Sequence, residues 1–342
     1  MSTPSAPPPL PLDGDTSELD VVLVADRRDF SNEIKLSDSY LECTEPDYLE
    51  ELNGTLQQIA RSVAYYEHPY QLLDRVSQHR DAVVISVWSG ERSRNRRSLV
   101  PAICEAYGIR YVGADAYAQT ICSDKALAKI FARRHGLAAP GSVLVEASGT
   151  DSQFRPLGAL SFPAVVKPNA EGSSIGISAK NIVHGVREAE ELSRELLSYY
   201  PTVLIEEFVQ GREVSIVLAG NMDRIFVDDV LEVELIGADV PLSETIFGFE
   251  YKNYDPYEVR QTLARDLLPD STRRAARALF RGLGKVEVMR IDGRVDDEGF
   301  KVIELSPDAH LGSICLVGAA FEAAGWTYPD MLRLLLLNSG RG

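Results

Sequence analysis

The strongest constraint on this chain is a pair of short alternating segments, KVEVMRID and FKVIELS, which lie between residues 285 and 306. The loop that joins them is rich in turn formers, so the two segments are typical of antiparallel strands in a hairpin. Strand side chains repeat every two residues, which puts Arg290 and Asp292 on one face of the first strand. Glu304 and Ser306 share a face of the second strand. We therefore expect Asp292 and Glu304 to converge.

Two carboxylates that converge beside an arginine repel each other unless a cation lies between them. Hard oxygen ligands of this kind suit Mg²⁺, or Mn²⁺, carrying substrate phosphates. A surface hairpin whose charges face water explains the same pattern. The pattern alone leaves both interpretations open.

The charge of the whole chain argues against a nucleic-acid partner. Lys and Arg number 35 and Asp and Glu number 51, which gives a net charge of −16 and no long basic stripe. No apolar run approaches the roughly 20 residues that span a bilayer, so we expect no membrane partner. The start of the chain lacks the features of a secretion signal. The chain has four widely spaced cysteines: Cys43, Cys104, Cys122 and Cys315. Their spacing fits neither a disulfide framework nor a zinc ribbon, so we expect the protein in a reducing cytoplasm.

Short apolar runs alternate with helix-like stretches along the rest of the chain. Residues 19–25, 81–87 and 108–113 are typical of parallel strands, and residues 49–64 are typical of a helix between them. Later runs predict further strands and helices: 163–167, 186–197, 203–207, 213–220, 223–234 and about 271–283. The mixture indicates α+β modules rather than one doubly wound sheet. We expect four segments: a disordered proline-rich tail at 1–18, an α/β domain at 19–120, a central domain at 121–208 and a C-terminal domain at 209–342.

One further helix is well marked. Ser123 can act as its N-cap, Asp124 complements the helix dipole, and Gly136 stands where a C-cap glycine belongs. Apolar residues recur inside it at helical spacing: Leu127, Ile130 and Phe131.

A glycine-rich loop, E-G-S-S-I-G at 171–176, follows the strand that ends at Lys167. Backbone N–H groups in such a loop can surround phosphate oxygens, together with its polar residues. A plain turn is the alternative. The loop also matches G-x-S-x-G, the nucleophile pattern of α/β-hydrolases, with Ser174 as the nucleophile and Asp308 and His310 downstream. A hydrolase elbow needs a strand directly before the serine and a helix directly after it, and neither is expected here.

A third polar region lies at 205–216, where a strand ends in Glu206 and Glu207 and the next strand begins at Glu213. Backbone groups from Glu207 to Val209 can read the edge of an adenine base, and Glu213 can accept from ribose hydroxyls. An exposed hairpin is the alternative interpretation of this region.

In this order, the segments resemble the ATP-grasp ligases, and specifically their D-alanine:D-alanine ligase branch, from about residue 20 to 335. The resemblance implies an ATP-grasp fold with an N-terminal α/β (pre-ATP-grasp) domain. It also implies that the chain binds ATP and Mg²⁺ (or Mn²⁺). A homodimer is expected only because the family commonly forms one.

The resemblance assigns the site residues by position. Lys125 and Lys167 match lysines that hold nucleotide phosphates, and Lys252 matches a lysine on a loop that closes over the γ-phosphate. The remaining positions match as follows: Glu206, Glu207, Phe208, Val209 and Glu213 at the adenine and ribose; Glu171, Ser173 and Ser174 in the phosphate loop; Asp292, Glu304 and Ser306 at the magnesium; Arg290 at the transition state; and Glu33, with Ser173 as its partner, at the ammonium group of the donor amino acid.

Several positions depart from the family pattern. Ser306 replaces an asparagine metal ligand, and His310 and Cys315 stand where the family has a glycine and a serine that binds the acceptor carboxylate. Asn253 replaces a tyrosine, and WSGERSRNRRS, residues 88–98, replaces an acidic glycine-rich motif. The departures cluster around the substrates, which implies the same reaction type on other substrates.

We therefore expect an ATP-dependent carboxylate–amine ligase that forms an amide or peptide bond through an acyl phosphate. Its substrates would be amino-acid-like, in specialised metabolism, and the bond can be intermolecular or close a ring. Two other hypotheses are a serine hydrolase and a catalytically silent ATP-binding module. Four arginines form a basic run: Arg92, Arg94, Arg96 and Arg97. This run is either a solvated loop or a clamp for the acceptor carboxylate.

Overall fold

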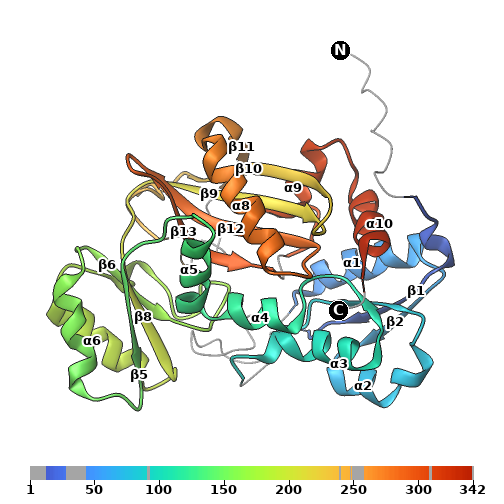
Figure 1. The fold of residues 1–342 in the computed structure, drawn as a ribbon, viewed down its shortest axis with the longest axis horizontal. Coiled ribbons are helices and arrows are strands. Elements are labelled where there is room, and N and C mark those ends of the chain that lie inside the picture. The colour runs from blue at the N-terminus through green and yellow to red at the C-terminus, as the bar shows by residue number, and fades with distance from the viewer. Residues whose placement is uncertain are drawn as a thin grey trace.

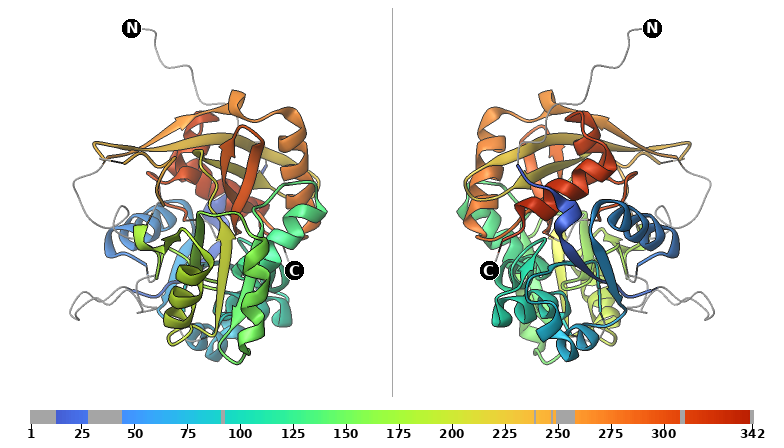
Figure 2. Two further views of the ribbon diagram at one scale, coloured as in Figure 1. Left: turned by 90° about the vertical axis from the view of Figure 1, so that its left-hand side faces the viewer. Right: turned by 90° about the vertical axis from the view of Figure 1, so that its right-hand side faces the viewer.

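The structure is a computed structural model that describes residues 13–27, 44–90, 93–238, 240–246, 248, 258–307 and 310–340. Within this part of the chain, three sheets follow one another in sequence (Figure 1). The C-terminal sheet lies across the top of both side views, with the N-terminal and central parts beneath it (Figure 2). Each sheet falls within one of the segments expected from the sequence, and the division of the chain into domains stays a prediction.

The first sheet is parallel, with strand order β2-β1-β3-β4. Its elements are β1 (Asp20–Val24), α1 (Pro46–Ile59), β2 (Ser62–Tyr66), α2 (Pro69–Asp74), β3 (Val83–Ser86), α3 (Leu99–Tyr107) and β4 (Arg110–Tyr111). The expected strands are confirmed. The helix predicted at 49–64 is wrong at its end, because residues from Ser62 onward pair with β1 as an edge strand.

The central sheet is antiparallel, with strand order β5-β8-β6-β7. Its elements are β5 (Ser142–Glu146), β6 (Ala164–Pro168), β7 (Ile182–Val183), α6 (Val186–Leu196) and β8 (Thr202–Glu207). Side chains from both central strands, such as Val166 and Ile205, are fully buried and pack against Ala189 and Leu196 of α6. The glycine-rich loop leaves this sheet at the end of β6.

The third sheet is antiparallel, with strand order β11-β10-β9-β12-β13. Its strands are β9 (Arg212–Gly220), β10 (Ile225–Ile236), β11 (Glu258–Leu263), β12 (Val288–Asp296) and β13 (Gly299–Ser306). The helices that follow or pack on it are α4 (Ala116–Ser123), α5 (Lys125–Arg134), α8 (Asp270–Gly282), α9 (Leu316–Ala323) and α10 (Tyr328–Asn338). Short 3₁₀ segments complete the described elements: η1 (Thr16–Glu18), η3 (Val76–Gln78), η4 (Arg96–Ser98), η5 (Asp151–Ala159), η6 (Ala179–Asn181) and η7 (Arg265–Leu267).

The two faces of β12 explain where the site forms. Met289 and Ile291 are fully buried in the core that includes α8, on one side of the sheet (Figure 1). Alternation sends Arg290, Asp292 and Arg294 to the opposite face. That face begins with Val288, which is buried in the core shared with α9 and α10. The same face therefore changes from apolar packing to a polar surface along one strand.

Helix α5 is present where the sequence predicts it, but its cap and its buried face differ. Asp124 caps the helix by accepting from the amide N–H of Leu127, whereas Ser123 is the last residue of α4. Leu127 and Ile130 are 46% and 61% exposed. The buried face instead carries two lysines and two alanines: Lys125, Ala128, Lys129 and Ala132. Of the predicted apolar stripe, only Phe131 packs against the core.

Two further expectations concern membranes and cysteines. Among the helices of the described ranges, none has the length and apolar character needed to cross a bilayer. The described cysteines, Cys104, Cys122 and Cys315, are not joined in disulfides, and Cys43 lies outside the described residues.

Candidate active site

The hairpin predicted from the sequence is formed by β12 and β13, and its register brings the expected residues together. Asp292 stands directly opposite Glu304, and Arg290 stands directly opposite Ser306. Arg290 Nε donates to both carboxylate oxygens of Asp292, at 2.7 and 2.9 Å. Ser215 Oγ donates to Asp292 Oδ1 at 2.6 Å. The convergence of the two carboxylates is confirmed.

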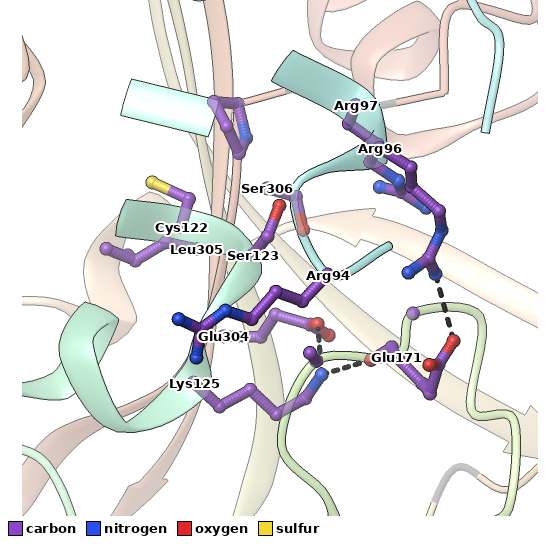
Figure 3. A pocket seen from close by; sticks show the side chains of 13 residues that line it. Arg94, Arg96, Arg97, Cys122, Ser123, Lys125, Glu171, Glu304, Leu305 and Ser306 are labelled. Atoms are coloured by element: carbon purple, nitrogen blue, oxygen red, sulfur yellow. Dashed lines mark hydrogen bonds and ion pairs between the residues drawn. The ribbon is translucent and has the colours of Figure 1, made fainter. Parts of the chain in front are cut away.

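Lys125 joins this hairpin to the glycine-rich loop. Its Nζ lies 2.9 Å from Glu304 Oε1, and it also donates to the backbone carbonyl of Glu171 (Figure 3). Arg290 thus pairs with Asp292, and Lys125 pairs with Glu304.

The donor set fits a divalent cation that brings other ligands with it. Two carboxylates and the Ser306 hydroxyl, which lies 3.5 Å from Asp292 Oδ2, come from adjacent strands. Within the described residues, no group of three or more His, Cys, Asp or Glu side chains gathers to hold a metal alone. A magnesium ion here would complete its six oxygen ligands with phosphate oxygens and water.

A buried charge cluster lies behind the phosphate loop. Glu206 is 2% exposed and is paired with Lys129 at 2.8 Å and with Lys167. Lys129 also donates to the carbonyl of Ile303 at 2.7 Å, so it links the central sheet to β13. Burial opposes the charge of Glu206, but Lys129 and Lys167 keep the pKa of this carboxyl below its usual value. Burial also lowers the pKa of Lys129 to about 8, although Glu206 raises it.

The lowered pKa of Lys129 predicts a pH dependence of stability. The unfolded chain binds a proton at this lysine up to its ordinary pKa of 10.5, whereas the folded chain releases it near pH 8. Stability should therefore rise with pH between these two values, because the unfolded state binds more protons there. Urea unfolding of the wild type and of Lys129→Met across this window tests the prediction. The variant should lose this part of the rise, and an identical slope in both proteins would contradict it.

The glycine-rich loop has a backbone that few residues adopt. Ser173 and Ser174 have φ of 50° and 60°, and Gly176 has φ of 71°. A Cβ on Gly176 would lie 3.0 Å from both Pro168 Cγ and the Tyr200 hydroxyl, so this position favours glycine. Consecutive left-handed serines are strained, and such strain is found mostly at functional loops.

The same loop shows why the hydrolase hypothesis is not favoured. β6 ends at Pro168, several residues before Ser174, and the next regular element is the 3₁₀ turn η6. A nucleophile elbow requires the strand and the helix to adjoin the serine directly. Asp308, the proposed acid of that triad, lies outside the described residues.

The region expected to hold the nucleoside is shaped by backbone hydrogen bonds. The N–H groups of Glu207 and Phe208 donate to Gly141 and Pro163 at 2.9 Å, and so are already engaged. The Glu207 side chain accepts from the amide groups of Gly141 and Ser161 at 3.0 and 2.9 Å. Of the three backbone N–H groups at 207–209, that of Val209 is therefore the candidate donor to the edge of the base.

Three arginines of the basic run line the pocket that also contains Lys125 and Glu304 (Figure 3). Arg96 is 7% exposed, and its Nη2 lies 2.9 Å from Glu171 Oε2. Arg94 and Arg97 come from the same turn and face the same pocket. The functional interpretation of this run is therefore strengthened for these three residues, while Arg92 lies outside the described part of the chain.

The positions that replace the family's glycine and serine are turned toward their own loop and toward α1. His310 stacks on Tyr48 with ring centroids 3.7 Å apart. The Cys315 thiol donates to the carbonyls of His310 and Gly312 at 2.7 and 2.9 Å. The Cys315 thiol thus donates within its own loop, whereas the family's serine hydroxyl binds the substrate.

Two predicted site residues, Glu33 and Lys252, and the variant position Asn253 lie outside the described residues. Ser173 is exposed. Two residues that sequence reasoning missed take part in the site. Lys129 lies four positions after Lys125 on the same helix face, and Arg294 continues the alternation of Arg290 and Asp292. Both could have been found by extending periodicities already in use.

Comparisons with known proteins show which family this chain matches. Residues 138–337, more than half of the chain, match the family model described as D-ala D-ala ligase C-terminus. A D-alanine–D-alanine ligase from Pediococcus pentosaceus is 27% identical over 310 residues, which cover 90% of this chain and 80% of the relative. One from Gloeobacter violaceus is 28% identical over 253 residues, covering 72% of this chain and 78% of the relative.

Solved structures show the same fold. The D-alanine–D-alanine ligase of Bacillus anthracis complexed with ATP superposes with a TM-score of 0.70 at 17% identity, covering 94% of this chain and 97% of that one. The VanG D-Ala:D-Ser ligase of Enterococcus faecalis gives 0.69 at 18% identity, covering 93% and 98%. The predicted ATP-grasp architecture, built from α+β modules, is confirmed.

Proposed function

Because this chain belongs to the D-alanine–D-alanine ligase family of ATP-dependent carboxylate–amine ligases, we propose that it joins a carboxylate to an amine on amino-acid-like substrates. The bond would form through an acyl phosphate made at the expense of ATP. The observation that carries the proposal is the register of the hairpin, which pairs Asp292 with Glu304 and sets Arg290 beside them. We propose further that the substrates belong to specialised metabolism.

The nucleotide and metal would be held by residues of the central and C-terminal parts of the chain. Asp292, Glu304 and Ser306 are the proposed magnesium ligands, by their placement on adjacent strands. When bound, MgATP supplies the phosphoryl group that activates the substrate carboxylate. Lys125 and Lys167, together with Lys252, offset negative charge that grows during the transfer. The loop at 171–176 surrounds the phosphates and keeps water away from the activated carbonyl.

Arg290 serves the second step of the proposed reaction. Its guanidinium lies on the polar face of β12 and is oriented by two hydrogen bonds to Asp292. A guanidinium fixed in this way can donate to the oxyanion that forms when the amine attacks. Glu33, with Ser173, would bind the ammonium group of the donor.

The basic segment 94–97 is the proposed site for the acceptor carboxylate. Cys315 does not offer a free hydroxyl in the family's serine position, whereas Arg97 lines the pocket beside Lys125 and Ser306. An arginine holds a carboxylate with two parallel hydrogen bonds, which a lone thiol cannot replace. Arg96 already pairs with Glu171, so it closes the pocket rather than receiving substrate.

Replacement of Arg97 tests this assignment. Arg97→Met should raise the KM of the amine substrate by about 10- to 100-fold, the effect of losing one charge-assisted hydrogen bond. The KM of ATP should stay within about twofold, as read by ADP release. Arg187→Met, at a residue whose side chain is 91% exposed on α6, is the matched control. A raised KM for ATP with an unchanged KM for the amine would assign Arg97 to the phosphates instead.

The substrates themselves are best found with a matrix of D- and L-amino acids, supplied singly and in pairs. ADP release and product mass identify each productive combination. Turnover of a single substrate with loss of one water would show ring closure, whereas a product from two substrates would show ligation. ADP formed by no combination would favour a silent ATP-binding module.

The proposed reaction also indicates a cellular compartment, and the family suggests an oligomeric state. An enzyme that consumes ATP is expected in the cytoplasm, where the described free thiols would stay reduced. We propose a homodimer on family grounds, and light scattering of the purified protein tests it.

A further inference from the structure

Arg294 ties together the part of the site proposed for the nucleoside. It extends from the polar face of β12, directly opposite Glu213 of β9. Its Nε donates to Glu213 Oε2 at 2.7 Å and its Nη1 donates to the carbonyl of Val209 at 3.1 Å. Its Nη2 donates to the carbonyl of Thr245 at 2.6 Å, and its Cζ lies 5.0 Å from the centre of the Phe208 ring.

These contacts are made where water is scarce. The side chain of Arg294 is 6% exposed, and that of Glu213 is 18% exposed. A carboxylate in such a place is costly without a partner, and a guanidinium fixes both its charge and its direction. Arg294 therefore decides which way the Glu213 carboxylate points.

Two polar groups are left over at the same place. Arg294 donates to Oε2 of Glu213, whereas Oε1 receives no hydrogen bond from the described residues. The N–H of Val209 donates to no described residue, although Val209 is 5% exposed and its carbonyl is engaged. An acceptor and a donor that lack partners in a sheltered place indicate a ligand with both kinds of group.

We propose that Arg294 is a positioning residue for the nucleoside end of ATP. It holds Glu213 so that Oε1 accepts from a ribose hydroxyl, and it holds Val209 so that its N–H donates to the base. The bond to the carbonyl of Thr245 also ties the segment 240–246 to Arg294. This inference rests on the proposed function, since it requires that ATP binds in this cleft.

Arg294 acts through Glu213, so its role is visible in the recognition of the ribose. The measurement compares ATP with its dideoxy analogue, which lacks both ribose hydroxyls. The KM for the analogue divided by the KM for ATP, here called the ribose ratio, reports the value of those hydroxyls to the enzyme. We expect the ribose ratio to be at least about tenfold in the wild type, because each lost hydroxyl leaves a polar group unpaired. Glu213→Ala, which removes the acceptor, should reduce it to near one.

Arg294→Met should reduce the ribose ratio toward the level of Glu213→Ala, and the double variant should reduce it no further than Glu213→Ala does. Arg260→Met, on the exposed edge strand β11, is the matched control and should keep the wild-type ratio. A role in folding alone would lower the thermal midpoint of Arg294→Met and leave the ribose ratio unchanged, which would overturn the proposal.

Two further variants test the role of Arg294. If Arg294→Met does not fold, Arg294→Lys retains the charge but not the three-way hydrogen bonding, and its ribose ratio should fall at least about threefold. A wild-type ribose ratio in Glu213→Ala would overturn the proposal without any change at Arg294. Calorimetry on the wild type separates the two claims, because ATP binding with an unaltered ratio in the variants defeats only the role of Arg294. An absence of ATP binding would defeat the proposed function and this inference together.

Discussion

Glu304→Gln is expected to lower kcat by about 10²- to 10³-fold, the usual effect of removing one fixed electrostatic contact at a reacting phosphate or oxyanion. The amide keeps the shape of the side chain but not its charge, so magnesium loses one of two anionic ligands from the protein. Lys125 loses its ion partner at 2.9 Å in the same change. The rate of ADP release and the magnesium concentration that gives half the maximal rate measure the effect.

The control for this variant is Glu298→Gln, in the turn of the same hairpin. The side chain of Glu298 is 79% exposed and pairs only with Lys301 among the described contacts. Its replacement should leave kcat unchanged. Wild-type activity in Glu304→Gln, with the urea midpoint preserved, would remove Glu304 from the metal site.

The second large effect is expected on stability, from Glu206→Gln. The buried cluster then contains Lys129 and Lys167 without the carboxylate that both contact. Removing one partner of a buried ion pair costs about 3 to 5 kcal/mol, because the remaining charge stays desolvated. The free energy of unfolding in urea at pH 7 measures the loss.

Lys129→Met provides the matched control for this cluster. It leaves one carboxylate and one ammonium group, Glu206 with Lys167, so the buried charges still balance. Its loss of stability should therefore be much smaller than that of Glu206→Gln. Equal losses in the two variants would show that packing, rather than charge balance, determines the stability of this cluster.

The site was most predictable where side chains alternate along a strand. Alternation places Arg290 and Asp292 on one face of β12, and Glu304 and Ser306 share a face of β13, so the sequence indicated a hairpin with converging polar side chains. The turn does not fix the pairing of Asp292 with Glu304, because a register shift between Asp292 and Gly293 sets these two residues opposite each other. The same alternation reaches Arg294, two residues beyond Asp292. The resemblance to the family carries no residue role at that position, so periodicity is the only sequence signal for it.

Prediction was weakest on α5, where charged side chains are buried and apolar side chains are exposed. The buried face of α5 carries Lys125 and Lys129 because Glu206 and the hairpin supply their partners from elsewhere in the chain. A rule that buries apolar side chains selects Leu127 and Ile130 instead, and both are exposed. The helical spacing of Lys125 and Lys129 puts both lysines on one face, but a single sequence does not show which distant carboxylates will be their partners.

A similar limit applies to the edge of the first sheet and to the loops around the substrate. The side chains of β2 (Ser62–Tyr66) are only partly buried and do not alternate clearly, so its sequence reads as a continuation of the preceding helix. The basic turn at 94–97 is compatible with a solvated or a functional loop, and only the fold brings it beside Glu171 and Glu304.

The most direct test of the central claim is calorimetry of adenine nucleotide binding, with and without magnesium, on the wild type and on Glu304→Gln. The account predicts that ATP binds the wild type, that magnesium tightens this binding at least about tenfold, and that the variant loses most of the magnesium effect. Binding of ATP with the same affinity in both proteins, whether or not magnesium is present, would contradict it.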